Sequence, residues 1–505
     1  MKPWFPPATA TALALVLSAQ SAAALTPEEA WTAIQAMTTA NGQTLTVAGT
    51  ERSGDTLTVT GITTTMQVPD GPSVTATMPS ASFRDLGDGT VEIAYPDNYQ
   101  AVVAFPQGDG PKSFTIDVAS TDLAILGSGT ADAPKFDYSA GSMVLTARDF
   151  LRQDGQTVDA GGTLTLSGMA GVYAVATQGS GQAFDSSMTV ASAELKANAN
   201  EPGGSGAFAL TLTASQLAVT GKTALVDPAL MQSGNLSAAL AAGFLVNGTM
   251  SSGPISIAAD LTGAPEAGHF EGTLAGTAAN ILLDAEAMDY GFSLTGGAFK
   301  ANGFDLPFPE VASAFGEIAI GFAMPVKASE DPKPFSALVK LTDLTLTEDI
   351  WAIFDPGSRL PRDPVTLIVD LDGTGAWTTD ILDPKAQMES GPDLPAKLFT
   401  LDLTQVLAKA AGAQIAALGG LTFDNANLQT YGGFPEPTGK ITVTMDGINA
   451  LLDALVAIGV VPEDDMMGAR MGLAMFAKPG AGPDQLVSEI EFKEGGFFVN
   501  GQRMF

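Results

Sequence analysis

The sequence contains no cysteine and only one histidine, His269. Without thiols the chain cannot form disulfides, carry a lipid on cysteine or build zinc sites with thiolate ligands. A Ser-His-Asp triad would depend on His269 alone. That residue stands at the start of an expected strand within Ala267–Glu271, so we interpret it as a surface or edge residue. We therefore expect no catalytic residue, no metal site and no cofactor.

Basic residues are scarce as well. Lys and Arg number 23 against 55 Asp and Glu, which gives a formal net charge of −32 at pH 7. Nucleic acids and anionic membrane surfaces attract clusters of Lys and Arg, so this composition argues against both as partners. We interpret the acidity as a solubility feature that is spread over the whole surface.

Apolar runs long enough to cross a membrane are also missing. The run Ala8–Leu17 is far shorter than the roughly 20 residues that span a bilayer as a helix. It follows Met1-Lys2 and precedes the small residues Ala22–Ala24, which is the order of a secretory signal peptide. We expect cleavage after Ala24 and a periplasmic mature protein that is not an integral membrane protein.

What the sequence has in abundance is strict alternation of polar and apolar residues. Period two in runs rich in Thr and Val predicts strands with one dry face and one wet face. Such runs are 44–47, 56–60, 163–166, 209–213, 255–257, 341–347, 366–371 and 441–444. We predict a mainly β fold, with long antiparallel sheets that are curled or elongated and a few short peripheral helices.

Glycine-rich segments separate these runs and predict turns. We place turns at 53–55, 87–89, 179–181 and 296–297. Loops are expected at 200–206 and 383–395. With these breaks we divide the chain into a signal peptide (1–24), an N-terminal helix with a β-rich region (25–225), a central β-rich region (226–390) and a C-terminal α+β region that ends in a hairpin (391–505).

Five helices are expected. The capping box Thr26-Pro27-Glu28-Glu29 begins the first, which ends near Asn41-Gly42. The other four cover 227–240, 403–418, 448–458 and 464–476. We expect Asp446 to cap the helix at 448–458, and we interpret all five as packing against a sheet.

The string Thr366–Thr374 ends an apolar strand in Asp-x-Asp-Gly-Thr and resembles the first motif of haloacid-dehalogenase phosphatases. The resemblance implies a Mg²⁺-dependent enzyme with Asp370 as phosphoryl acceptor and Asp372 as acid and base. That chemistry needs a parallel sheet with helical crossovers. The flanks predict antiparallel strands, so we interpret Asp372-Gly373 as a hairpin turn and keep the phosphatase as a remote alternative.

Two further stretches carry a family resemblance. The first combines Trp351–Gly357 with Leu360–Pro364. The second runs from Gly472–Met475 through Pro479-Gly480 and Asp484–Leu486 to Phe497–Arg503. Both are similar to the bacterial family called domain of unknown function 2125, and we expect the likeness to cover most of the mature chain. The shared residues are turns, a hairpin and a helix end, and they imply no catalytic residues.

The texture of that family is similar to AsmA-like envelope proteins. The likeness implies a curled sheet whose apolar inner face forms a β-groove that can hold lipid. Because the helices are too few to cover such a sheet, apolar strand faces are left for a ligand or a partner. Our candidate lining residues are Leu338, Leu344, Leu346, Leu367 and Val369.

We therefore expect a non-enzymatic protein of the cell envelope that binds or shields lipid or another apolar ligand. The alternative is an interaction scaffold for other envelope proteins that has a dry core and binds no small ligand.

Overall fold

The computed structural model describes residues 24–40, 42–68, 71–106, 111–178, 181–201, 203–227, 230, 234–263, 267–389 and 395–504. Nearly all of the expected signal peptide lies outside these residues, and so does the expected helix start at Pro228. In the described part no helix combines the length and apolar composition needed to cross a membrane.

The chain is 63% strand and 11% helix, which confirms the predicted fold class. The strands of the first half are β1 (Gln43–Thr46), β2 (Gly49–Ser53), β3 (Thr56–Gln67), β4 (Ser73–Asp85), β5 (Val91–Ala94), β6 (Asn98–Ala104), β7 (Pro111–Thr121), β8 (Ala124–Thr130), β9 (Ala133–Arg152), β10 (Ala160–Gln178), β11 (Gly181–Asn200), β12 (Ala207–Ala224), β13 (Leu245–Ser252) and β14 (Ile255–Thr262).

The strands of the second half are β15 (Gly268–Leu274), β16 (Gly276–Leu283), β17 (Ala287–Gly303), β18 (Val311–Pro325), β19 (Lys333–Leu346), β20 (Val365–Trp377), β21 (Ala396–Ala410), β22 (Ala413–Asp424), β23 (Glu436–Asp446), β24 (Lys478–Pro479), β25 (Gln485–Lys493), β26 (Gly496–Val499) and β27 (Gln502–Arg503). The helices in the described residues are α1 (Pro27–Ala40), α3 (Leu236–Ala241), α4 (Glu348–Trp351), α5 (Pro384–Glu389), α6 (Ile448–Ala457) and α7 (Glu463–Phe476).

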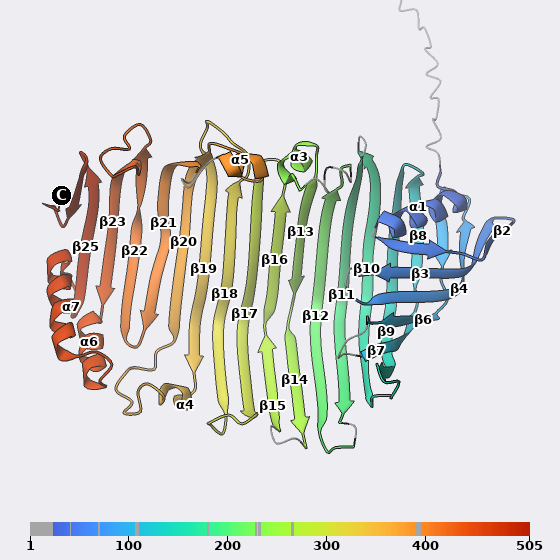
Figure 1. The fold of residues 1–505 in the computed structure, drawn as a ribbon, viewed down its shortest axis with the longest axis horizontal. Helices are drawn as coiled ribbons and strands as arrows, with labels where there is room; N and C mark the ends of the chain where they lie inside the picture. Colours follow the sequence, from blue (N-terminus) through green and yellow to red (C-terminus); the bar gives the residue numbers. More distant parts are fainter. Residues whose placement is uncertain are drawn as a thin grey trace, which may run out of the picture.

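All the strands belong to one antiparallel sheet. From β9 to β23 the long strands follow one another side by side, while β13 with β14 and β15 with β16 each share the length of one long strand. The described helices lie at the ends and edges of the sheet in Figure 1: α1 at the N-terminal end, α6 and α7 at the other end, and α3, α4 and α5 along the edges. None of them crosses the middle of the sheet.

The largest core lies in the N-terminal region, where β1–β8 fold back and α1 packs on them. Trp31 of α1 makes an edge-to-face contact with Phe83 of β4, with ring centroids 5.6 Å apart, and the core continues to Phe136 of β9. The predicted capping box begins this helix, because Thr26 N–H donates to Glu29 Oε2 (2.9 Å) and Glu29 N–H donates to Thr26 Oγ1 (3.3 Å). Both bonds satisfy amides that a helix start leaves free.

The alternating runs lie in strands, apart from Val47 and Thr347 at the ends of two runs, and the predicted turns at 53–55 and 87–89 join β2 to β3 and β4 to β5. The prediction of a helix at 403–418 is wrong, because this segment forms the end of β21, a turn and the first half of β22. Ala411 (φ 49°) and Gly412 (φ 81°) both have positive φ, as a two-residue hairpin turn requires. The alanine-rich sequence favours a helix, but pairing with β20 and β23 outweighs that propensity.

Two predicted turns prove to lie inside strands. Asp372-Gly373 is in the middle of β20, where Gly373 pairs with Phe335 on one side and Leu401 on the other. The Phe335 ring occupies the space that a Cβ at Gly373 would need, so glycine is required there for close packing. Gly296-Gly297 lies inside β17, and it marks a kink.

The kink runs across the sheet from β10 to β19. Residues with positive φ occur in one cross-strand row, namely Gly168 of β10, Gln216 of β12, Gly296 of β17 and Asp343 of β19. Each shifts the alternation by one residue. β9, whose Gly141 lies opposite Gly168 in this row, shows the same shift, because Ala140 and Met143 lie three apart and both line the same cavity. The kink therefore keeps one face of the sheet apolar above and below it.

Three other predicted helices are present with changes. In the described residues α3 begins at Leu236 after the N-cap Asn235, and Gly234 with φ +72° precedes it, so the helix does not run through 234–235 as predicted. Helices α6 and α7 match the predicted positions. The expected cap Asp446 instead ends β23 and accepts a hydrogen bond from Gln485.

The amides at the start of α6 are capped by Asp484, which lies 35 residues away from Asn449 in the sequence. Its carboxylate accepts hydrogen bonds from Asn449 N–H (3.3 Å) and Ala450 N–H (3.0 Å). Burial alone would raise the pKa of Asp484, but these N–H groups outweigh it and lower that pKa. A tertiary contact thus replaces the local cap that the sequence predicted.

The sheet crosses both expected domain boundaries without a break. β12 pairs with β13 and β14 across 225–226, and β20 pairs with β21 across 390–391. The division into three mature regions stays a prediction.

Candidate functional site

One face of the sheet carries an uninterrupted row of apolar residues. The residues face one another directly from strand to strand and therefore point to the same side. We call them the apolar row: Tyr138, Gly171, Met188, Val219, Met250, Ala279, Phe292, Ile320, Val339 and Val369. The row crosses ten strands, which corresponds to about 43 Å at the usual strand spacing.

Many of these side chains are left in solvent. The exposed fractions are 37% for Val219, 50% for Met250, 45% for Phe292, 58% for Ile320 and 47% for Val339. A second row lies beside this one on the same face, where Tyr290 pairs with Ile281 on one side and with Phe322 on the other. These three side chains are also exposed. A contiguous apolar surface of this kind is rare on a protein that works alone, and such surfaces mark binding sites.

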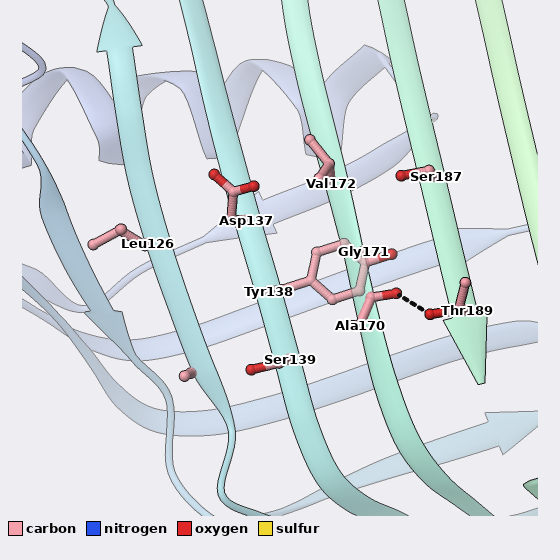
Figure 2. A pocket seen from close by; sticks show the side chains of 10 residues that line it. Leu126, Asp137, Tyr138, Ser139, Ala170, Gly171, Val172, Ser187 and Thr189 are labelled. Carbon is pink, nitrogen blue, oxygen red and sulfur yellow. Dashed lines mark hydrogen bonds between the residues drawn. The ribbon is translucent and has the colours of Figure 1, made fainter. Parts of the chain in front are cut away.

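The opposite face is polar. In the neighbouring register Ser187, Thr220, Thr249 and Asn280 face one another, and the hydroxyl groups of Thr220 and Thr249 lie 2.6 Å apart. Figure 2 shows an open hollow on this face, lined by Asp137, Ser139, Ser187 and Thr189 among others. It is a feature of a wetted surface, and it holds no converging charged groups.

The predicted lining residues divide between the two faces. Leu367 and Val369 lie on the apolar face, and Leu367 is 42% exposed. Leu344 and Leu346 lie on β19 beyond the kink at Asp343, and Leu346 pairs with Ser313.

Leu338 is the exception among the predicted lining residues. It faces Asp370 on the polar side, because neighbouring residues on a strand point to opposite faces. It is therefore not part of the apolar row.

At its N-terminal end the apolar row enters a cavity of about 350 Å³ beneath α1. Tyr138, Ala140 and Met143 of β9 and Met169 of β10 line it on the sheet side, and Trp31 lines it from α1. Its polar lining consists of Thr38, Thr64, Tyr95, Tyr99, Ser120 and Tyr138. None of the lining residues carries a charge.

Three tyrosines distinguish this cavity. Burial raises the pKa of Tyr95 to about 12, with a further contribution from Tyr99, and burial also raises the pKa of Tyr99 and of Tyr138. Their hydroxyl groups therefore stay protonated and neutral at ordinary pH. The Tyr138 ring lies over Gly171 of the next strand, where a Cβ would collide with it (Figure 2).

The cavity and most of the apolar row were missed by sequence reasoning. The signal for the row was present in the alternation and its one-residue shifts, for instance Leu166 followed by Met169. No local signal marks the cavity, because its walls come from α1, β1, β3, β4 and β6–β10.

The residues of the phosphatase motif lie in a different context from the one that the motif requires. Asp370 and Asp372 are on β20, which is antiparallel to both of its neighbours, β19 and β21. Asp372 accepts a hydrogen bond from Thr404 Oγ1 (3.0 Å). Among the described residues no group of three or more His, Cys, Asp or Glu side chains is placed to hold a metal ion.

His269 is the second residue of β15, at the strand start that the sequence predicted. Its Nδ1 lies 2.8 Å from Asp260 Oδ1 across the strand pair, and its side chain is partly exposed. The carboxylate of Asp260 raises the pKa of His269, mainly through this hydrogen bond. The two side chains form a hydrogen bond on the surface of the sheet.

The motif that begins at Trp351 forms a rigid loop between β19 and β20. The carboxylate of Asp355 is fully buried and accepts hydrogen bonds from Leu360 N–H (2.8 Å), Arg359 N–H (3.0 Å) and Arg362 Nη1 (2.6 Å). Burial alone would raise the pKa of Asp355, but these donors outweigh it and hold the pKa at about 2. The guanidinium of Arg362 also lies over the Trp351 ring, 4.8 Å from its centroid. The motif residues fix the shape of a loop.

Residues 400–504 match the model of a protein family described as "Uncharacterized protein conserved in bacteria (DUF2125)". No curated protein and no solved structure matches the chain. The matched region holds β22–β27, α6, α7 and most of β21, together with the second of the two stretches that carry the resemblance. The first stretch, 351–364, lies outside it. The similarity of the chain to this family is thus found in its C-terminal region, residues 400–504.

Proposed function

We propose that this protein binds lipid, whose hydrocarbon chain lies along the apolar row. The observation that carries the proposal is the exposure of Val219, Met250, Phe292, Ile320 and Val339 in one continuous line with no described helix above it. Burying apolar surface of this kind against hydrocarbon is worth about 25 cal/mol per Å². The row is longer than the roughly 30 Å hydrocarbon core of a bilayer, which two acyl chains span end to end. A single stretched acyl chain therefore fits along the row.

Lipid is favoured over a second copy of the chain as the occupant. Two flat sheets could cover each other's apolar rows, but a second sheet could not fill the cavity into which the row runs at Tyr138. A flexible hydrocarbon chain can lie along the apolar row and also enter the cavity. The excess of acidic residues also disfavours close packing of two copies.

The expected site of action is the periplasm, and the expected role is binding without catalysis. The secretory signal pattern at the N-terminus supports export. A long antiparallel sheet with one apolar face supports the remoter likeness to AsmA-like envelope proteins, which would shield lipid during its passage through water.

An interaction scaffold is the second candidate, and one observation favours it. Met467, Met471 and Met475 are 63%, 70% and 61% exposed and follow one side of α7 at a spacing of four residues. Methionine-rich helix surfaces adapt to many partners. In Figure 1 α7 lies at the C-terminal end of the sheet, whereas the apolar row ends on β20, so a scaffold role would not require lipid.

Native mass spectrometry of the full chain, purified from the cells that produce it, tests the proposal. We expect bound species with lipid masses, and we expect Phe292→Asn combined with Ile320→Asn to remove them. The matched control combines Ser293→Asn and Ala323→Asn on the polar face of the same two strands. Bare protein in every preparation, or a dimer that only the apolar-row variant dissociates, would overturn lipid binding.

A further inference from the structure

The cavity beneath α1 differs in chemistry from the rest of the apolar face. Most of the apolar row is open, whereas the cavity has walls from the helix, from the folded-back strands and from β9 and β10. Trp31, Ile34 and Thr38 of α1 lie about one helical turn apart and close one side of it. Because Tyr138 belongs to both, the cavity is the walled end of the row.

Polar groups that could hold a ligand are concentrated in this cavity. The hydroxyl groups of Tyr95, Tyr99 and Tyr138 form no hydrogen bond with any residue that the structure describes, whereas Thr38 Oγ1 donates to Ile34 O (2.8 Å). None of the three hydroxyl oxygens is sealed from solvent, so each can exchange hydrogen bonds with water or with a ligand that enters the cavity. A ligand with hydroxyl or carbonyl oxygens would supply these partners.

The cavity has no group that could neutralise a charged ligand. None of the side chains that line it in the described residues is basic or acidic, and the raised pKa values keep its three tyrosines neutral. Taking a phosphate, carboxylate or ammonium group out of water without a counter-charge is prohibitively costly. The chemistry of the walls therefore selects an uncharged head.

The volume sets a limit on that head. About 350 Å³ is at the small end of the range for ligand sites, which is about 300–1,000 Å³. The cavity can hold a small head and the first part of a chain, while the rest of the chain continues along Met188 and Val219 of the apolar row.

We propose that the cavity beneath α1 binds the uncharged, oxygen-bearing head of a neutral single-chain amphiphile, such as a monoacylglycerol. Tyr95, Tyr99 and Tyr138 exchange hydrogen bonds with its hydroxyl and ester oxygens. This inference rests on the proposed function, because the chain of the same molecule lies on the apolar row.

The test compares three ligands with the same 16-carbon chain, namely a monoacylglycerol, the free fatty acid and a lysophosphatidylglycerol, at pH 8. Binding is measured below the critical micelle concentration by isothermal titration calorimetry. We expect the monoacylglycerol to bind at least about tenfold more tightly than either anion, because an anion would bring an uncompensated charge into the cavity. A tenfold difference in affinity corresponds to about 1.4 kcal/mol. Equal affinities, or tighter binding of an anion, would overturn the proposal.

Two variants locate the head group. Tyr95→Phe removes one hydroxyl and should weaken monoacylglycerol binding about three- to tenfold, the usual value of one hydrogen bond, with no change for the anions. Ala140→Phe fills the cavity and should abolish the preference for the neutral head. Ser139→Phe, its neighbour on the polar face, is the control. Should Ala140→Phe fail to fold, Tyr95→Phe and the wild-type ligand series still decide.

The outcome also separates this inference from the proposed function. If lipid binding is lost with Phe292→Asn and Ile320→Asn but Tyr95→Phe and Ala140→Phe bind all three ligands as wild type does, the row binds lipid and the cavity is not the head site. If none of the three ligands binds and no lipid copurifies, the proposed function fails as well.

Discussion

Phe292 of β17 and Ile320 of β18 lie directly opposite each other on the same face of the sheet, and both are half exposed. Cross-strand apolar pairs usually stabilise a sheet because a second layer covers them. Here no described element provides that layer. This pair belongs to the apolar row and is the reason to expect a ligand.

The two faces of β19 provide a direct comparison of neighbouring residues. Val339→Asn should weaken binding of a fluorescent lipid roughly tenfold, because about 1.5 kcal/mol of apolar contact is lost. Leu338→Asn should leave binding unchanged, because Leu338 faces Asp370 on the polar side. Equal losses in the two variants would mean that the faces are not distinguished by the ligand.

The kink gives a prediction about stability. Gly296 has φ +58°, and a Cβ there would come within 2.7 Å of the Ala275 side chain. Gly296→Ala should therefore lower the free energy of unfolding by about 1–3 kcal/mol, measured with urea. The control is Gly468→Ala in the interior of α7, where a Cβ meets no atom within 4 Å and should add roughly 0.5–1 kcal/mol. A stable Gly296→Ala protein would show that the kink is not strained.

Asp355 makes stability depend on pH in the acid range. Its pKa is about 2 in the folded protein and 3.8 as a model value, so the unfolded chain binds more protons between these values. Stability from this residue is therefore complete above pH 3.8 and is lost as the pH falls toward 2. Urea unfolding at pH 5, 4, 3 and 2 should show a smaller decrease for Asp355→Asn than for the wild type. Parallel curves would contradict this role.

The start of α6 offers a test of which carboxylate caps it. Asp484→Ala should lower the free energy of unfolding by about 0.5–2 kcal/mol, because two amides of the first turn lose their acceptor. Asp446→Ala should cost less, since within the described residues the Asp446 carboxylate accepts a hydrogen bond only from the Gln485 side chain. Thermal unfolding of both variants measures the two losses of stability. A larger loss for Asp446→Ala than for Asp484→Ala would support the local cap that the sequence predicted.

Much of the fold could be predicted from the sequence because alternation is a local signal. The strands around Thr163–Leu166 and Thr366–Leu371 follow from it directly. The segment 403–418 could not be assigned correctly, because its alanines favour a helix and only pairing with neighbouring strands overrides them. Asp372-Gly373 resembled a turn because the sequence does not show that Phe335 covers the glycine.

The candidate site was predictable only in part. Leu367 and Val369 lie on the apolar face of the sheet, whereas Leu338 was chosen without knowing the phase of β19. The phase depends on the kink at Asp343, which shifts the pattern by one residue. The cavity could not be predicted at all, because Trp31, Tyr95 and Tyr138 meet only when the N-terminal strands fold back.

Photocrosslinking along the sheet tests lipid binding on the apolar row most directly. A photoreactive phenylalanine analogue is placed at Val219, Phe292 or Val339 on the row, and at Thr220, Ser293 or Leu338 on the polar face of the same strands. After irradiation in the producing cells, mass spectrometry should find adducts of lipid mass at the three row positions and at none of the others. Adducts on both faces, or on neither, would contradict lipid binding along the row.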